Sequence, residues 1–325
     1  MTTEDRIYQG DYKKWIKFAN SLKLRIAIRI SNAVPEYAQE KAEEAVSHPY
    51  GVMDSNDCDA YDNITATNYK NGLASVNSWG EVRANACIVS FMNGYQDPRC
   101  EAYFTKSSVS GDYDYIGVRS GIQGITTSMF STYSTVKVET KTPMLIFNAA
   151  EVAFLRAEGA LKKWNMGGTA EEFYKEGIRL SFNEHGISGA DAYIANNTNV
   201  PADYICPLNA AYNYTNPCKL TVAWDKTGAN ADEDNLQRIL TQKMIANFPI
   251  GNETWADFRR TGYPAVFPAH DNLSTQGVTK ERQQRRLRFS EDEYNSNGAN
   301  VTEACTFLSN GQDTDATDLW WAKKD

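Results

Sequence analysis

The sequence predicts a mainly α-helical protein, built from tetratricopeptide-like helix hairpins with long irregular insertions between them. Three segments each carry two apolar runs at helical spacing, joined by a short turn. They are residues 11–46, 149–186 and 232–262. Two other segments, residues 51–78 and 95–142, show no such period. Because helices must bury their apolar faces, we expect the hairpins to stack within one domain spanning residues 1–325.

The first hairpin is predicted from a long amphipathic run. Trp15, Phe18, Leu22, Ile26 and Ile30 fall on one helical face between residues 11 and 33. A proline then begins a second helix over residues 35–46, because proline suits the first turn of a helix.

The second hairpin has the clearest signals. One helix is expected over residues 149–164, and a second begins where Thr169 and Glu172 form a capping box. Gly159 and Gly177 are small enough to let the two backbones approach closely. The unit is about the length of one tetratricopeptide repeat.

The third hairpin and one further helix follow from caps and breakers. An apolar row on residues 232–249 ends at a proline, and a shorter helix ends at Gly262 and Pro264. A helix is also expected over residues 79–93, whereas the tail from residue 268 onward reads as mostly irregular.

Composition excludes several classes of protein. The 325 residues carry 33 Lys+Arg against 41 Asp+Glu, so the formal charge of −8 gives no electrostatic case for a nucleic-acid partner. The mean hydropathy of −0.54, with no apolar run of membrane-spanning length, excludes a transmembrane helix. The polar N-terminal residues carry no signal peptide, so nothing in the chain as given would export it.

The cysteines do not form a metal or redox motif. The six are scattered without a C-x-x-C pair, which argues against a zinc ribbon or a thioredoxin-type site. Cys206 and Cys218 could close a short surface loop through a disulfide, or all six could be small buried apolar residues.

Motifs for catalysis or metal binding are weak. His48, His185 and His270 are far apart in sequence, and no metalloprotease, nucleophile-elbow or phosphate-loop motif occurs. The acidic loop residues could bind Ca²⁺, but a solvated acidic loop is the preferred interpretation because the EF-hand spacing is missing. This loop cluster comprises Asp54, Asn56, Asp57, Asp59 and Asp62, and the same interpretation applies to Asp313, Asp315 and Asp318. We therefore expect no catalytic residue, no metal site and no cofactor.

Aromatic residues in the insertions are the strongest functional signal. Phe, Trp and Tyr make up 12% of the chain, and many lie outside the predicted helices. Sugars are recognised by flat rings that stack on their C–H faces while polar side chains bind the hydroxyls. The candidate ligand-binding residues are Trp79, Tyr61, Tyr69, Tyr95, Tyr113 and Tyr115, with Asn77 and Asp62 as hydroxyl partners. The alternative is that these rings fold inward and fix the loops to the helices.

A basic run near the C-terminus has a structural interpretation. Arg282, Arg285, Arg286 and Arg288 lie close together in an acidic chain. We expect them to form a solvated face or an intramolecular clamp on acidic neighbours.

Several motifs together resemble one family. They are WIKFANSLKLRIAIR at residues 15–29, DPR at 97–99, AEVAFLRAE at 150–158, WNMGG at 164–168, QK at 242–243, WADFRRTGYP at 255–264 and LWWAK at 319–323. In this order they are similar to the SusD/RagB outer-membrane lipoproteins of Bacteroidetes, and they cover nearly all of the chain.

The resemblance implies a function and a set of partners. Such proteins have an α-helical fold with tetratricopeptide-type hairpins, and they bind a glycan or another small nutrient at the cell surface. They cover a SusC-type TonB-dependent transporter in the outer membrane like a lid, and they are not enzymes. The implied partners are thus an oligosaccharide or other nutrient and the transporter, with membrane attachment only through a lipid anchor.

The family pattern also begins earlier than this sequence does. A lipoprotein signal, an acylated cysteine and further helices usually precede the part that matches, so we expect the chain to correspond to the C-terminal two-thirds of the family fold. An apolar helix face near the first hairpin should then be exposed. Two rival functions stay open, namely a helical scaffold that docks the transporter without a glycan site, and an all-helical glycoside hydrolase with two nearby carboxylates.

Overall fold

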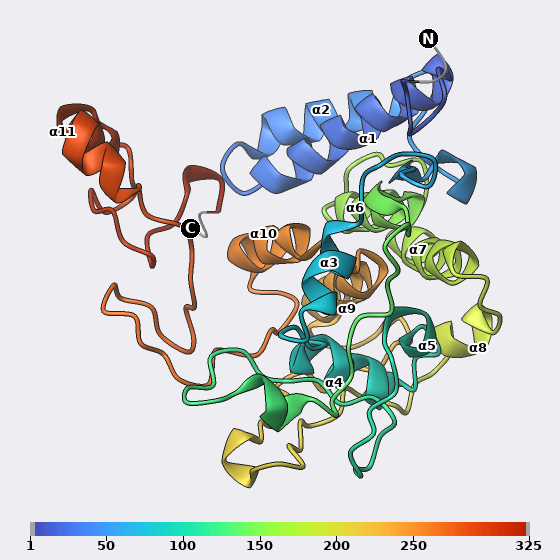
Figure 1. Cartoon of the computed structure of the whole chain (residues 1–325). Coiled ribbons are helices and arrows are strands. Elements are labelled where there is room, and N and C mark those ends of the chain that lie inside the picture. Colours follow the sequence, from blue (N-terminus) through green and yellow to red (C-terminus); the bar gives the residue numbers. More distant parts are fainter. Residues whose placement is uncertain (1–3, 323–325) are drawn as a thin grey trace.

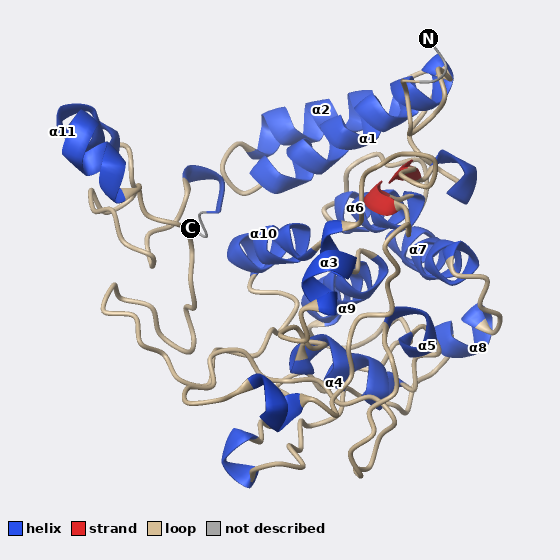
Figure 2. Ribbon diagram, viewed as in Figure 1, coloured by secondary structure: helices blue, strands red, loops and turns tan. Residues whose placement is uncertain are grey.

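The computed structural model describes residues 4–322 and confirms the mainly helical fold (Figures 1 and 2). Residues 1–3 and Lys323 of the terminal motif lie outside the described part. The helices are α1 (Tyr12–Ile30), α2 (Pro35–Ser47), α3 (Gly72–Ser78), α4 (Ala86–Tyr95), α5 (Cys100–Tyr103), α6 (Ala149–Leu161), α7 (Ala170–Glu184), α8 (Ala190–Ile194), α9 (Ala231–Ala246), α10 (Gly251–Thr261) and α11 (Glu291–Cys305). Two short strands, β1 (Ala60–Asp62) and β2 (Met144–Phe147), form an antiparallel pair.

Helix α6 lies at the centre of the helical stack. It packs against α7, α9 and α1, while α1 packs on α2 and α9 on α10 (Figure 1). The predicted capping box forms, because Thr169 accepts a hydrogen bond from the Glu172 backbone and the Glu172 carboxylate accepts one from the Thr169 backbone. Gly177 allows the close approach of α6 and α7, since a Cβ there would lie 2.7 Å from the Phe154 ring. Gly159 instead faces Met166 in the turn.

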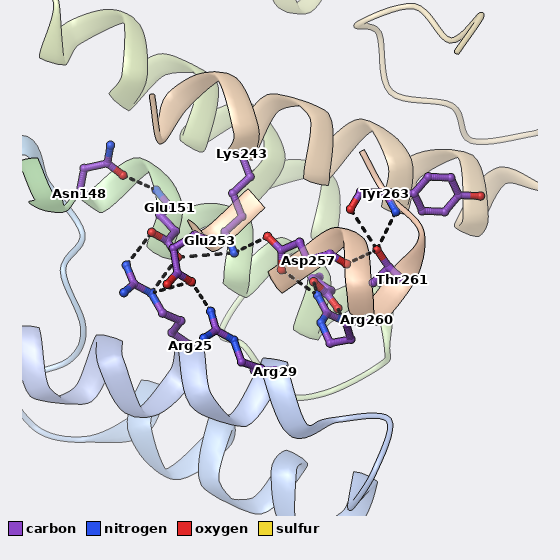
Figure 3. Close-up of polar contacts among 11 residues, drawn as sticks. Arg25, Arg29, Asn148, Glu151, Lys243, Glu253, Asp257, Arg260, Thr261 and Tyr263 are labelled. Atoms are coloured by element: carbon purple, nitrogen blue, oxygen red, sulfur yellow. Dashed lines mark hydrogen bonds and ion pairs between the residues drawn. The ribbon is translucent and has the colours of Figure 1, made fainter. Parts of the chain in front are cut away.

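Ion pairs buried inside the stack join α1, α6, α9 and α10 (Figure 3). Arg25 forms two hydrogen bonds to Glu151, at 2.9 and 2.7 Å, and Lys243 lies 3.5 Å from Glu151 and 2.9 Å from Asp257. Arg260 contacts both Asp257 and a further acid on α6. Each cation therefore has an anion within reach, which offsets the cost of removing these charges from water.

A second buried network fixes the insertion to the stack. The fully buried Arg99 donates to both Asp97 oxygens, at 2.9 and 2.6 Å, and to Ser181 of α7 and Gln242 of α9, both at 2.9 Å. Tyr193 of α8 also donates to Asp97, at 2.8 Å. The DPR motif thus acts as a structural clamp, which holds the start of residues 95–142 in place.

The helix predicted over residues 79–93 is wrong as one element. Helix α3 ends at Ser78, Gly80 adopts φ +75°, and α4 begins only at Ala86. Between them, Ala84 donates its backbone N–H to Ser134 at 2.8 Å and accepts from Val118 at 2.9 Å. The chain is extended here because it pairs with neighbouring loop segments, and the Asn85 side chain then caps α4.

The C-terminal tail contains helix α11, which the sequence analysis missed, and it lies apart from the stacked hairpins (Figure 1). The arginine clamp is confirmed. Arg282 and Arg285 pair with Asp318 at 2.7 and 2.6 Å, Arg286 with Asp313 at 3.0 Å, and Arg288 with Asp315 at 3.4 Å. These three aspartates are therefore ion-paired and at most partly exposed, rather than a solvated acidic loop.

The surface disulfide between Cys206 and Cys218 is not present, because both are free and buried. The apolar face expected on the first hairpin is exposed, with Leu22, Ile26 and Tyr37 among its residues. Within residues 4–322, the helices are too short or too polar for any of them to span a bilayer.

Candidate binding site

Trp79 is the most prominent ring on the insertions. Its side chain follows the last residue of α3 and is 67% exposed. Helix α3 is fixed at its start, where the Asn71 side chain caps Leu73 and Ala74 and also donates to Thr142 at 3.0 Å. The indole is therefore exposed on a well-anchored helix, which favours stacking on a ligand.

The backbone after Trp79 is also held firmly. The Arg83 guanidinium donates to three carbonyl oxygens, those of Gly80, Val82 and Phe130, at 2.7–2.8 Å. Such bonds keep the turn rigid, so little loop entropy remains to be lost when a ligand binds.

The Asn77 side chain helps to hold helix α3 and Trp79 in place. Its amide donates to the Val136 carbonyl at 3.2 Å, and its Oδ1 is buried without a hydrogen-bond partner. Since the oxygen is buried and the nitrogen is bonded within the protein, neither polar atom of Asn77 is exposed and free for a ligand hydroxyl, and its role as a hydroxyl partner stays a prediction.

Tyr113 and Tyr115 line a cavity of about 240 Å³. Asn93, Asp112 and Asp203 also line it, so flat rings and hydroxyl-binding groups occur together here. Tyr113 is 44% exposed. Hydrogen bonds from the Asn216 backbone and then from Lys219 keep the pKa of Asp203 below its usual range, so this acid is a charged acceptor at neutral pH.

One extended segment, residues 130–136, supports both ring-bearing loops. Its carbonyl groups bind Asn77 and Arg83 beside Trp79. Its Ser134 accepts from Ile116, one residue after Tyr115, and donates back to the same residue. The turn after Trp79 and the loop with Tyr115 are thus hydrogen-bonded to the same segment, although they are far apart in sequence.

Tyr69 and Asp62 lie at a different place, beside the N-terminal segment. Tyr69 is 62% exposed, with the Arg6 guanidinium 5.2 Å from its ring centroid. Arg6 forms two bonds to Asp62, at 2.6 and 2.7 Å, and this hydrogen bonding lowers the pKa of the Asp62 carboxyl. Tyr61 points inward and its hydroxyl donates a hydrogen bond to Glu184, so this hydroxyl is not free to bind a ligand.

Tyr95 is placed in the core and requires a correction. It is 2% exposed, its hydroxyl donates to the Leu220 carbonyl at 3.1 Å, and its ring packs against Tyr193. The residue ends α4 on its buried side, where a ring is needed to fill the core. It cannot serve as a surface platform in this structure.

The two carboxyl groups whose pKa is raised by burial lie outside both cavities. Burial raises the pKa of Asp59 to about 6 and that of Glu184 to about 8, but neither residue lines a cavity. The acidic loop is paired with α1, through Lys17 to Asp54 at 2.6 Å and Lys14 to Asp57 at 3.5 Å. Residues 4–322 contain no group of three His, Cys, Asp or Glu arranged to hold a metal ion.

A larger cavity of about 650 Å³ was not anticipated from the sequence. It lies between α10, the start of α4 and residues 266–284, and Trp255 is one of its walls. Trp255 is the first residue of the WADFRRTGYP motif, but nothing in the local sequence pattern predicts that distant segments pack around it.

Comparison with known proteins identifies the family. The family model of SusD-like proteins, described as SusD and RagB outer membrane lipoproteins, matches residues 1–322. The chain belongs to this SusD-like family. A comparison with curated proteins finds no match.

Solved SusD-like structures share the fold over the whole chain. One from Bacteroides thetaiotaomicron VPI-5482 is 50% identical, with a TM-score of 0.94, and covers 100% of this chain and 67% of its own. A chitin-binding SusD homologue from Flavobacterium johnsoniae is 41% identical, with a TM-score of 0.93 and the same coverage. A homologue from Bacteroides uniformis ATCC 8492 is 42% identical, with a TM-score of 0.91, and covers 100% of this chain and 68% of its own. The SusD-like chain thus spans about two thirds of the length of these relatives.

Proposed function

We propose that this protein is a non-catalytic glycan-binding component of an outer-membrane uptake system of the SusC/SusD type. The observation that carries the proposal is the exposed Trp79 indole, mounted on a capped helix. Membership of the SusD-like family and the likeness to a chitin-binding homologue support it.

The ligand would stack on Trp79 and on Tyr113, the exposed rings held by residues 130–136. The charged Asp203 and the side-chain oxygen of Asn93, whose amide nitrogen already donates to the Tyr115 carbonyl at 2.8 Å, give the tyrosine cavity acceptors suited to sugar hydroxyls. Tyr115 forms part of the wall, and Tyr69 is a separate ring available to a longer ligand. Tyr61 and Tyr95 are left out of the proposed site because their hydroxyls are used inside the protein.

The proposed partner on the membrane side is a SusC-type TonB-dependent transporter, to which this protein would deliver the glycan. The rival hydrolase has less support, since the acids with raised pKa, Asp59 and Glu184, lie outside both cavities. Incubation with chromogenic glycosides provides the check, and release of the chromophore at a rate above the buffer blank contradicts the non-catalytic assignment.

Calorimetric titration with a panel of oligosaccharides, starting with chito-oligosaccharides, tests the binding function. Trp79→Ala should raise the Kd of the bound sugar about tenfold or more, because a stacked Trp is a typical energetic hot spot. Trp224→Phe, in the core beside Tyr174, is a matched indole control that should leave the Kd unchanged. Equal affinity of Trp79→Ala and the unaltered protein removes Trp79 from the site, and no binding across the panel contradicts the proposed function.

A further inference from the structure

The larger cavity differs in character from the proposed glycan site. It has a volume of about 650 Å³, within the range of roughly 300–1,000 Å³ that is typical of small-molecule sites. Its walls come from segments far apart in sequence and are mainly rings and aliphatic side chains. The aromatic members are Phe248, Trp255, Phe258 and Phe267, joined by Ile88, Met244, Ile250 and Val266.

The Trp255 wall is fixed before any ligand arrives. Its indole nitrogen donates to the Gln284 carbonyl at 3.0 Å. The Arg259 guanidinium lies 3.7 Å from the ring centroid, so it covers one face of the indole. The ring surface left for the cavity is the opposite face or an edge, in one set orientation.

Three of the four amide side chains that line the cavity are already hydrogen-bonded to the protein. Asn85 donates to Ser120 at 3.1 Å, Asn272 to the Val278 carbonyl at 2.6 Å, and Gln283 to the Val266 carbonyl at 3.2 Å. A sugar in this cavity would lose the water bound to its hydroxyls and gain few bonds in return, which is costly. The cavity therefore favours a ligand with few hydroxyl groups.

The charges at the cavity favour a neutral or anionic ligand. Lys280 lines it and forms no ion pair with any part of the chain from residue 4 to residue 322, whereas Asp315 is paired with Arg288 at 3.4 Å. Arg259 also withdraws negative potential from the indole by lying on its covered face, so a second cation would gain little from stacking there.

We propose that this cavity is a second binding site, which takes a small apolar molecule with an aromatic or alicyclic ring, either uncharged or anionic. The site is separate from the glycan site at Trp79, and it is held together by the packing of residues 266–284 against α10. It does not depend on the proposed glycan function, since a different set of side chains forms it.

Fluorescence titration with N-phenyl-1-naphthylamine, a neutral aromatic probe, tests the proposal. We expect saturable binding of one probe per chain. Gly251→Phe is the blocking variant, because Gly251 lines the cavity and a Cβ there meets nothing within 4 Å. Its Kd for the probe should rise about tenfold or more. Gly298→Phe on α11 is the matched control, with equally open space around its Cβ, and should leave the Kd unchanged.

A second blocking variant guards against a folding defect. Lys280→Trp places a ring at the cavity from an exposed position, so it should weaken probe binding while cooperative urea unfolding stays unchanged. The anionic probe 1-anilinonaphthalene-8-sulfonate should bind the unaltered protein as well. Probe binding that both blocking variants leave intact overturns the proposal, as does displacement of the probe by chito-oligosaccharides at concentrations that saturate the Trp79 site.

Discussion

Glu158 of α6 accepts hydrogen bonds from both terminal nitrogens of Arg260 of α10, at 2.5 and 2.8 Å, and each side chain is only 1% exposed. Arg260 also reaches Asp257 at 3.2 Å, which in turn holds Lys243 of α9. The pair thus connects three helices of the stack through a network that solvent hardly reaches.

Breaking this pair should strongly destabilise the fold. Arg260→Met leaves Glu158 buried without its hydrogen-bonded cation and with only Lys162 at 4.0 Å, so the free energy of unfolding should fall by about 3–5 kcal/mol. Urea unfolding followed by circular dichroism measures the change. Lys106→Met is the control, because its partner Asp114 and Lys106 itself are 66% exposed, and it should cost no more than about 1 kcal/mol. Similar losses in the two variants contradict a structural role for the buried network.

Stability should also depend on pH through Glu184. Burial raises the pKa of this carboxyl from 4.5 to about 8, so the folded protein holds its proton more tightly than the unfolded chain does. The stability that this proton provides is fully present below about pH 4.5 and is lost as the pH rises through about 8.

The Glu184→Gln variant isolates that titration because a glutamine stays neutral. The variant should gain stability relative to the unaltered protein as the pH rises from 4.5 to 8. His185, with a pKa lowered to about 4 by burial, titrates in both proteins and cancels in the difference, whereas the charge of Asp59, whose pKa is about 6, itself contributes to the raised pKa of Glu184. Urea midpoints across this window provide the measurement, and a flat difference would show that Glu184 titrates normally.

The two tyrosines of the second insertion should behave differently. Tyr113→Ala removes an exposed ring from the smaller cavity and should weaken glycan binding several-fold without affecting stability. Tyr95→Phe should do the reverse, leaving affinity unchanged and lowering stability by about 1 kcal/mol, because it deletes the buried bond to the Leu220 carbonyl. Calorimetry and urea unfolding on both variants separate the effects, and weaker binding by Tyr95→Phe would contradict the assignment.

The sequence predicted those elements whose signals are local. Apolar spacing and the Thr169–Glu172 box were enough for the hairpins. The basic run from Arg282 to Arg288 in an acidic chain indicated either a solvated face or a clamp, and the clamp is what forms. The break after Trp79 was missed because it depends on pairing with Ser134, which is remote in sequence. Helix α11 was missed because few of its side chains are buried, so its polar sequence carries no apolar period.

For the candidate site too, local signals could be predicted from the sequence and contacts between distant residues could not. An accessible Trp79 could be predicted from its position next to an irregular, polar segment, but the burial of Tyr95 depends on Tyr193 and Leu220, which only the fold brings near. The cavity at Trp255 likewise requires segments that are remote in sequence to converge, and no local pattern encodes that meeting.

The C-terminal clamp should control how easily the tail detaches. Asp318→Asn weakens the contacts to Arg282 and Arg285, so limited proteolysis should cut residues 306–319 several-fold faster. Asp292→Asn, an exposed acid at the start of α11, is the control and should leave the cleavage rate unchanged. Equal rates in the two variants would mean that packing alone holds the tail.

The distribution of thiols offers a way to attach the protein to a surface. Five cysteines are buried and free, whereas Cys305 at the end of α11 is partly accessible. A maleimide should therefore react first at Cys305, on helix α11, which lies away from the hairpins and from α3 (Figure 1). Immobilised through that single sulfur, the molecules would share one orientation on a sensor chip.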